Sequence, residues 1–131
     1  MAATNREPTY ILLVEDEEFL REVATESLQD AGYEVLAAGD GDAGLKALQS
    51  DATIDVLLSD IRLPGLDGYQ LAEAGKALRP HMKLILMTGY APDLPATLKQ
   101  AVFRVLQKPF RVDSLSSVVA AALGRTDGAS Q

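Results

Sequence analysis

Short, largely apolar runs alternate along this chain with stretches in which apolar residues recur at three- and four-residue intervals. The short runs predict buried strands, and the longer periodic stretches predict amphipathic helices. The predicted strands are residues 11–14, 35–38, 55–59, 83–87 and 103–107. The predicted helices are residues 19–31, 43–49, 69–78, 92–101 and 112–123. Strands that are apolar on both faces are covered by helices on each side, which indicates a parallel sheet and a doubly wound α/β fold.

The sequence supports the predicted helices unequally. In the first helix, the residues that recur at helical spacing are Phe19, Leu20, Val23, Ala24, Leu28 and Ala31. The helix at 92–101 is the weakest, because Pro95 is tolerated only within a first turn. Asp67 is interpreted as the cap of the helix at 69–78, because a carboxylate at that position accepts hydrogen bonds from free amides of the first turn.

The composition fits one folded domain. The chain has 131 residues, of which 47% are hydrophobic and 24% are charged, as in ordinary globular domains. We assign residues 10–123 to this domain, residues 1–9 to an N-terminal extension and residues 124–131 to a flexible C-terminal tail. The chain contains no cysteine, which excludes disulfides and thiolate metal sites.

Charge and hydropathy narrow the range of partners. The net charge of −7 disfavours direct binding to nucleic acid, because phosphate contacts need clustered Lys and Arg. No apolar run approaches the roughly 18 residues of a membrane span, and the N-terminal residues lack the apolar core of a secretory signal. We therefore expect no membrane insertion and a cytoplasmic location.

Polar residues stand where the predicted strands stop. Glu15 and Asp16 follow the first strand, Asp60 the third, Thr88 the fourth and Lys108 the fifth. Ligands of open α/β sheets bind beyond the carboxyl ends of the strands, so these residues are predicted to meet in one site. Three carboxylates in one place are unfavourable unless they are protonated or bridged by a cation. Oxygen ligands without His or Cys favour a hard ion such as Mg²⁺.

The same residues contain the groups that phosphoryl transfer requires. Lys108 supplies a compact positive charge for a phosphoryl oxygen, and Thr88 supplies a hydroxyl that can donate to the same group. Positioning and neutralisation of charge provide most of the catalysis in such reactions. Asp60 is the candidate nucleophile, which would form an aspartyl phosphate.

From about residue 10 to residue 123, the chain resembles the receiver domains of two-component response regulators. The matching segments are Glu15-Asp16, the segment 60–68 (Asp-Ile-Arg-Leu-Pro-Gly-Leu-Asp-Gly), Thr88 and Lys108-Pro109-Phe110. The resemblance implies a single-domain flavodoxin-like (CheY-like) fold, a doubly wound five-stranded parallel sheet of order 2-1-3-4-5 with five helices. It also implies structural roles for Pro64 and Gly68, and a cis Lys108–Pro109 peptide bond.

The resemblance further implies a role for each site residue. Asp60 would take a phosphoryl group from a phosphohistidine of a histidine kinase or a histidine phosphotransfer protein. Thr88 and Lys108 would bind the phosphoryl oxygens. The implied cofactor is Mg²⁺, with Mn²⁺ as an alternative. Its implied ligands are Asp16, Asp60, Glu15 through a water molecule, and the backbone carbonyl of Arg62. The domain would be a signalling receiver that assists its own phosphorylation and dephosphorylation, and not an enzyme in the usual sense.

Two positions depart from the family pattern. Val105 stands where many receivers carry the Tyr or Phe that changes rotamer as the Thr moves on activation, and Tyr90 is the nearest candidate for a substitute. Arg62 stands where a small or polar residue is common. Its side chain either overhangs the site, where it would slow or select the phosphodonor, or points to water.

Alternative functions stay open at this point. One is a phosphorylation-independent binding module on the receiver fold, which would leave the acidic pair, Asp60 and Lys108 without a role. Another is a small-molecule enzyme on a flavodoxin-like fold, which would need a Gly-rich loop after the first strand, where this chain has four acidic residues.

The resemblance also implies an output surface. A downstream protein would bind the face formed by the fourth helix, fifth strand and fifth helix, and a weak homodimer is a further candidate partner. We expect a stand-alone regulator, because Met1 is a plausible native start, although the segments around Thr88 and Lys108 are similar to those of receivers fused to histidine kinases.

Overall fold

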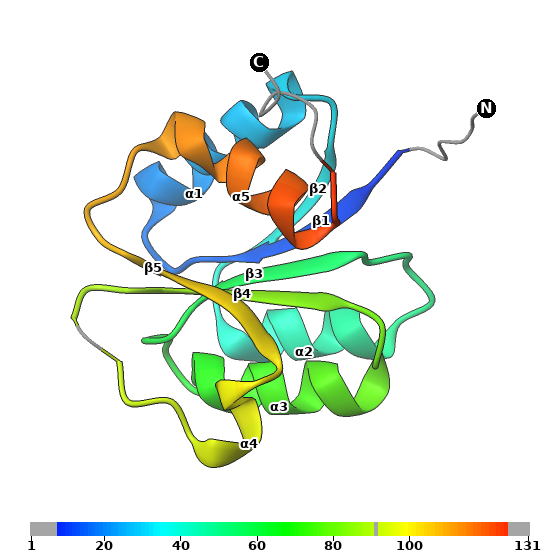
Figure 1. Cartoon of the computed structure of the whole chain (residues 1–131), viewed down its shortest axis with the longest axis vertical. Coiled ribbons are helices and arrows are strands. Elements are labelled where there is room, and N and C mark those ends of the chain that lie inside the picture. Colours follow the sequence, from blue (N-terminus) through cyan, green and yellow to red (C-terminus); the bar gives the residue numbers. More distant parts are fainter. Residues whose placement is uncertain (1–7, 91, 126–131) are drawn as a thin grey trace.

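The computed structural model describes residues 8–90 and 92–125, and its strands form one parallel five-stranded sheet of order β2-β1-β3-β4-β5 (Figure 1). The strands are β1 (Tyr10–Val14), β2 (Glu34–Ala38), β3 (Val56–Asp60), β4 (Lys83–Thr88) and β5 (Val102–Gln107). The predicted doubly wound sheet and its strand order are therefore confirmed. Asp60 and Thr88 are the last residues of β3 and β4 rather than the residues that follow these strands.

Helices cover both faces of the sheet. They are α1 (Glu18–Asp30), α2 (Gly41–Gln49), α3 (Gly68–Leu78), α4 (Ala96–Lys99) and α5 (Leu115–Ala122), with a 3₁₀ turn η1 (Val112–Ser114) before the last. In Figure 1, α1 and α5 lie on one side of the sheet, and α2, α3 and α4 lie on the other. The strands β1, β3 and β4 are thus sandwiched between two layers of helix.

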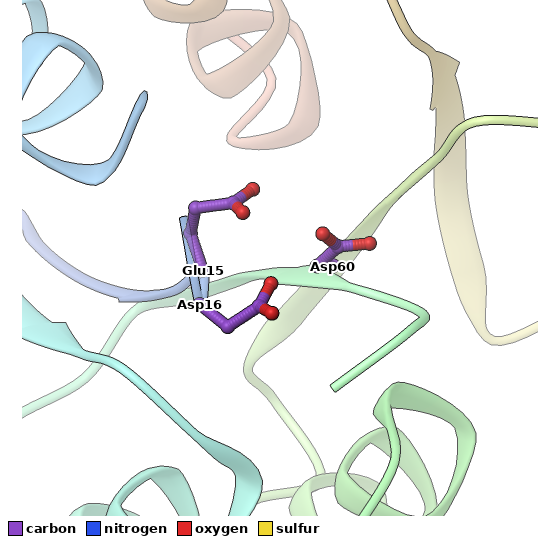
Figure 2. Close-up of side chains that lie close together, drawn as sticks. All are labelled: Glu15, Asp16 and Asp60. Carbon is purple, nitrogen blue, oxygen red and sulfur yellow. The ribbon is translucent and has the colours of Figure 1, made fainter. Parts of the chain in front are cut away.

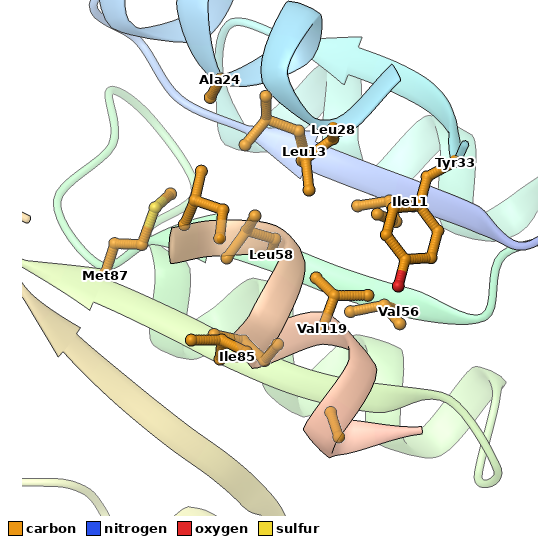
Figure 3. Close-up of a cluster of buried hydrophobic side chains, with 13 residues drawn as sticks. Ile11, Leu13, Ala24, Leu28, Tyr33, Val56, Leu58, Ile85, Met87 and Val119 are labelled. Carbon is orange, nitrogen blue, oxygen red and sulfur yellow. The ribbon is translucent and has the colours of Figure 1, made fainter. Parts of the chain in front are cut away.

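The core consists of two apolar clusters separated by the sheet. Successive residues of a strand point to opposite faces, so Leu13 and Leu58 belong to the cluster under α1 and α5 (Figure 3). Leu12 and Leu57 belong to the cluster under α2 and α3. All four side chains are fully buried, and each contributes about 1.5–3 kcal/mol by leaving water. This explains why the central strands are apolar without alternation.

The predicted helix at 92–101 is wrong in extent. Only Ala96–Lys99 is α-helical, and Pro95 precedes the helix instead of lying within its first turn. A proline disfavours the helical conformation of the residue before it, which explains the late start. The single turn is anchored to α3, where Glu73 accepts a hydrogen bond from the Thr97 hydroxyl and Lys76 donates to the Thr97 carbonyl at 3.0 Å.

The ends of α1 also differ from the predicted apolar face. Ala24 and Leu28 are buried in its middle, but Phe19 in the first turn is 73% exposed, and Ala31 beyond the last turn is exposed too. Helical spacing selects the side of the helix that faces the sheet, but not how far along the helix the sheet extends. The predicted cap at Asp67 is confirmed, because its carboxylate accepts from the Gln70 amide as part of a capping box.

Two residues just outside the assigned domain, Thr9 and Arg125, contact each other. The Arg125 Nη2 donates to the Thr9 hydroxyl at 2.6 Å, and the Thr9 carbonyl accepts from the Glu34 amide at 2.9 Å. This contact lies where β1 begins, at the edge of the sheet opposite the strand ends that carry the acids. The remaining parts of the expected extension and tail, residues 1–7 and 126–131, lie outside the described residues.

Two glycines allow close backbone approaches below the site. At Gly68, the first residue of α3, a Cβ atom would lie 2.2 Å from the Asp60 carbonyl oxygen. At Gly41, the first residue of α2, it would lie 1.8 Å from the Leu66 carbonyl oxygen. The loop between β3 and α3, which contains the exposed Pro64, is therefore packed directly against Asp60 and against the start of α2.

We expect Gly68→Ala to destabilise the fold by about 3 kcal/mol, because an added methyl group there meets backbone that cannot move aside. The matched control is Gly89→Ala in the loop after β4, where a Cβ atom would have no neighbour within 4 Å. Urea denaturation of both variants measures the difference. Equal stabilities of the two variants would contradict the packing described here.

Candidate functional site

Three carboxylates meet at the carboxyl edge of the sheet. Glu15 and Asp16 follow Val14 at the end of β1, and Asp60 ends the neighbouring β3. The two strands are paired in parallel with Val14 opposite Ser59, so their ends are adjacent. Figure 2 shows the three side chains directed toward a common space, and each offers an oxygen within 4.8 Å of the others. The structure thus brings together the acids that the sequence placed at separate strand ends.

Lys108 links this acidic cluster to β5. Its Nζ lies 2.8 Å from Oδ2 of Asp60 and 3.0 Å from Oε1 of Glu15. Its backbone amide donates to the Thr88 carbonyl at 2.7 Å, which holds the residue beside the end of β4. The Lys108–Pro109 peptide bond is cis, the isomer that the family resemblance implied.

Glu15 is the most enclosed of the three acids, with 1% of its surface exposed. Its Oε2 accepts from the Glu17 amide at 3.0 Å, while Oε1 is occupied by Lys108. Its own amide donates to the Ala38 carbonyl at 3.0 Å. Both carboxylate oxygens of Glu15 are therefore engaged by protein donors.

Burial and ion pairing shift the pKa values of Glu15 and Lys108 in opposite directions. Burial raises the pKa of the Glu15 carboxyl, although hydrogen bonds from the Glu17 amide and from Lys108 lower it in part. Burial disfavours the ammonium form of Lys108, but hydrogen bonds to Asp60 and Glu15 outweigh that cost and raise the pKa of Lys108. The lysine therefore carries its charge at neutral pH and forms ion pairs with both carboxylates.

Thr88 and Asp60 are also buried. Thr88 ends β4 with 1% of its surface exposed, and Asp60 is 5% exposed. The Thr88 hydroxyl accepts from the Tyr90 amide at 3.2 Å. The remaining carboxylate oxygen of Asp60, Oδ1, accepts from the Arg62 amide at 3.2 Å. Each of these two side chains is thus connected to a different loop at the rim of the site.

Arg62 is exposed, and its side chain lies against Tyr90 at the rim of the site. Its guanidinium carbon lies 5.0 Å from the centre of the Tyr90 ring, in a cation–π contact between the two rim loops. Both residues line a cleft of about 380 Å³, whose other lining residues include Thr88, Tyr69 and Asp93. Val105, in contrast, is partly buried and packs against the core on the α2–α3 side of the sheet.

The donor set of the cluster fits a hard divalent ion. All three residues offer carboxylate oxygens, and Asp16 is exposed while Glu15 and Asp60 are buried. Within the described parts of the chain, the Asp16 carboxylate has no hydrogen bond or ion pair. Mg²⁺ prefers oxygen ligands and keeps several waters, so a partly open cluster of this kind suits it.

One residue of the site was missed by sequence reasoning. Arg21, in the second turn of α1, donates from Nη1 to the Glu15 carbonyl at 2.9 Å. The available signal was a basic residue one helical turn beyond four consecutive acids. That spacing alone does not show whether the side chain turns back to the loop or extends into water.

Comparison with known proteins assigns the family. Residues 11–120 match the response regulator receiver domain. The chain belongs to this family, whose members are the receiver domains of two-component signalling systems. No helix among the described residues is long and apolar enough to cross a membrane.

Relatives of known identity are longer proteins. The chain is 35% identical to the response regulator protein FleR of Pseudomonas aeruginosa over 124 residues, which are 92% of this chain and 26% of FleR. It is 37% identical to the DNA-binding transcriptional regulator NtrC of Salmonella typhimurium, covering 86% of this chain and 24% of NtrC. It is 34% identical to the sensor kinase CckA of Brucella abortus, covering 89% of this chain and 13% of CckA. The chain therefore spans about a quarter or less of these relatives.

Solved structures show the same fold. A response regulator receiver domain protein from Clostridium thermocellum superposes with a TM-score of 0.81 at 28% identity, covering 92% of this chain and 98% of that one. The receiver domain of the hybrid histidine kinase CckA gives a TM-score of 0.75 at 35% identity, covering 87% of this chain and 98% of that one.

We expect Lys108→Ala to lower the free energy of unfolding by about 2 kcal/mol at pH 7, less than for a fully buried pair because the lysine is 25% exposed. The variant leaves Glu15 and Asp60 buried without their shared cation. Burial already raises the pKa of Glu15, and loss of the lysine raises it further. A raised folded-state pKa favours the folded state at lower pH, so the deficit shrinks toward pH 5.

Urea denaturation at pH 7 and pH 5 without divalent metal measures this deficit. The control is Lys46→Ala on the exposed side of α2, which should be neutral at both pH values. A Lys108→Ala deficit that is equal at the two pH values would show that the lysine acts through packing and not through charge.

Proposed function

We propose that this chain is a phosphoacceptor receiver in which Asp60 takes a phosphoryl group from a phosphohistidine of a histidine kinase or a histidine phosphotransfer protein. The observation that carries the proposal is the pairing of Lys108 with both Asp60 and Glu15, at 2.8 and 3.0 Å, beside the exposed Asp16. A protein that only needed the fold for binding would have no use for three converging carboxylates, which oppose one another at neutral pH.

The chain's own residues account for the proposed chemistry. A carboxylate oxygen of Asp60 forms the new P–O bond while the P–N bond of the phosphohistidine breaks. The imidazole nitrogen keeps the electron pair and takes up a proton. Lys108 holds Asp60 in place before transfer and neutralises a phosphoryl oxygen afterwards, and the Thr88 hydroxyl donates to another oxygen. The same groups would assist the later hydrolysis of the aspartyl phosphate.

Asp16, Asp60 and the Arg62 carbonyl would hold Mg²⁺ directly, or Mn²⁺ in its place. Both oxygens of Glu15 are already hydrogen-bonded, which supports the expectation that this residue acts through a water molecule. When bound, the ion neutralises charge on the phosphoryl oxygens.

The alternative function is a phosphorylation-independent binding module. One observation favours it: Phe103 on the edge strand β5 is a large apolar side chain that is 42% exposed. In either case the output would pass through the face of α4, β5 and α5, to a downstream protein or a second copy of the chain. The relatives that carry this domain include transcriptional regulators and a sensor kinase, and we propose a cytoplasmic location for this chain.

The decisive experiment is intact mass after incubation with acetyl phosphate and Mg²⁺. We expect an added mass of about 80 Da in the wild type. This adduct should disappear in Asp60→Asn and in the presence of a chelator. Asp67→Asn, which changes a capping carboxylate near the same loop, is the matched control and should still be phosphorylated. Absence of the adduct in the wild type, with a phosphohistidine donor as well, would favour the binding module.

Tyr90 is proposed to replace the missing aromatic at Val105 as the switch residue. Its amide donates to the Thr88 hydroxyl at 3.2 Å, and its ring forms the cation–π contact with the Arg62 guanidinium. A Thr88 hydroxyl that turns to a phosphoryl oxygen changes its contact with Tyr90. The competing attraction of the phosphoryl group for Arg62 weakens the cation–π contact, which is worth only about 0.5–1 kcal/mol at an exposed site.

We expect Tyr90→Ala to accept the phosphoryl group normally but to lose at least half of the phosphorylation-induced amide shifts in α4 and β5. Tyr90→Phe keeps the ring and should behave as the wild type. Nuclear magnetic resonance spectra recorded with and without acetyl phosphate measure these shifts. Full-sized shifts in Tyr90→Ala would mean that Tyr90 is not the switch residue.

A further inference from the structure

Arg21 reaches back from α1 to the loop that carries the acidic pair. It belongs to the second turn of the helix, and its side chain crosses the helix start to place Nη1 2.9 Å from the Glu15 carbonyl oxygen. Its backbone amide simultaneously donates to the Glu17 carbonyl at 2.9 Å. The residue therefore contacts the backbone of the loop on both sides of Asp16.

With this contact, each polar group of Glu15 has a hydrogen-bond partner. The amide, both carboxylate oxygens and the carbonyl oxygen of Glu15 each have a separate protein partner: Ala38, Glu17, Lys108 and Arg21. Of these partners, Arg21 is the one that bonds to the peptide group joining Glu15 to Asp16. The orientation of that peptide group affects the position of the Asp16 backbone, from which the exposed carboxylate extends.

Gly39 provides the space for this arrangement. A Cβ atom at Gly39 would lie 3.1 Å from the Arg21 Nη1 and 3.5 Å from its guanidinium carbon. The guanidinium group thus lies directly over the backbone that follows β2, between that strand and the end of β1. Arg21 is only partly exposed, which agrees with a guanidinium group that lies against these two backbone segments.

We propose that Arg21 is a positioning residue for the metal site, which orders the Glu15–Asp16 peptide so that the Asp16 carboxylate is held where the ion binds. The inference rests on the proposed Mg²⁺ chemistry. Partners that orient the ligands of a metal typically change metal affinity by about 10- to 100-fold when they are removed.

Charge and geometry make opposite predictions for this residue. If Arg21 acted mainly as a nearby positive charge, its removal would strengthen the binding of a divalent cation. If it acts by ordering the loop, its removal weakens binding. We expect the ordering effect to dominate, because the hydrogen bond is made to a backbone carbonyl and not to a carboxylate.

The test is the affinity for Mg²⁺ by titration calorimetry on the unphosphorylated chain. Arg21→Gln should bind Mg²⁺ about tenfold more weakly than the wild type, and Arg21→Lys, which keeps the charge and a donor, should recover part of the loss. The matched control is Arg79→Gln. Arg79 also donates to backbone carbonyls, those of Leu48 and Ser50, but at the opposite edge of the sheet, so its variant should bind Mg²⁺ normally.

A second measurement does not depend on the metal. In the metal-free protein, amide hydrogen exchange at Glu15 and Glu17 should be at least several-fold faster in Arg21→Gln than in Arg79→Gln, because the loop is less ordered. Unchanged exchange at both amides, or Mg²⁺ binding by Arg21→Gln that equals or exceeds that of the wild type, would overturn the inference. A wild type that binds no Mg²⁺ would instead overturn the proposed function, and the metal-site role of Arg21 with it.

Discussion

The site depends on one cation shared by two buried carboxylates. Lys108 bonds to Asp60 and to Glu15 at once, and neither acid is more than 5% exposed. Isolated charges in such surroundings are costly, and removal of one member of a buried pair leaves the other uncompensated. The ion pairs therefore offset the cost of burying two carboxylates at this edge of the sheet. The same lysine is available to a phosphoryl group that arrives at Asp60.

The sheet supplies the geometry that the ion pairs need. Parallel pairing of β1, β3 and β4 places Glu15, Asp60 and Thr88 at one edge. The pairing of β4 with β5 brings in Lys108, whose amide is fixed by the Thr88 carbonyl. Below the site, Gly68 lets α3 start directly against Asp60. The acidic centre is thus rigidly supported from the core side, while Arg62 and Tyr90 occupy its exposed rim.

The accuracy of each prediction depended on whether the interactions that decide the feature are made by residues close together in the sequence. The central strands and the cap at Asp67 depend on neighbouring residues, and both were predicted correctly. The helix at 92–101 was predicted too long, because the restriction that Pro95 places on the preceding residue keeps the helix from starting before Ala96. Phe19 fits the apolar spacing of α1 but is exposed, because no pattern within the helix reports where its neighbours end.

The sequence by itself determined the sheet, the two helical layers and the residue types at the strand ends, because apolar periodicity and strand-end position are properties of short segments. Only the tertiary structure decided which atoms meet. That Lys108 is shared between Glu15 and Asp60, that Arg62 stacks on Tyr90, and that Arg21 turns back to the Glu15 carbonyl are choices among side-chain conformations. Such choices are made by partners distant in sequence or by competition with water, and local pattern carries no information about either.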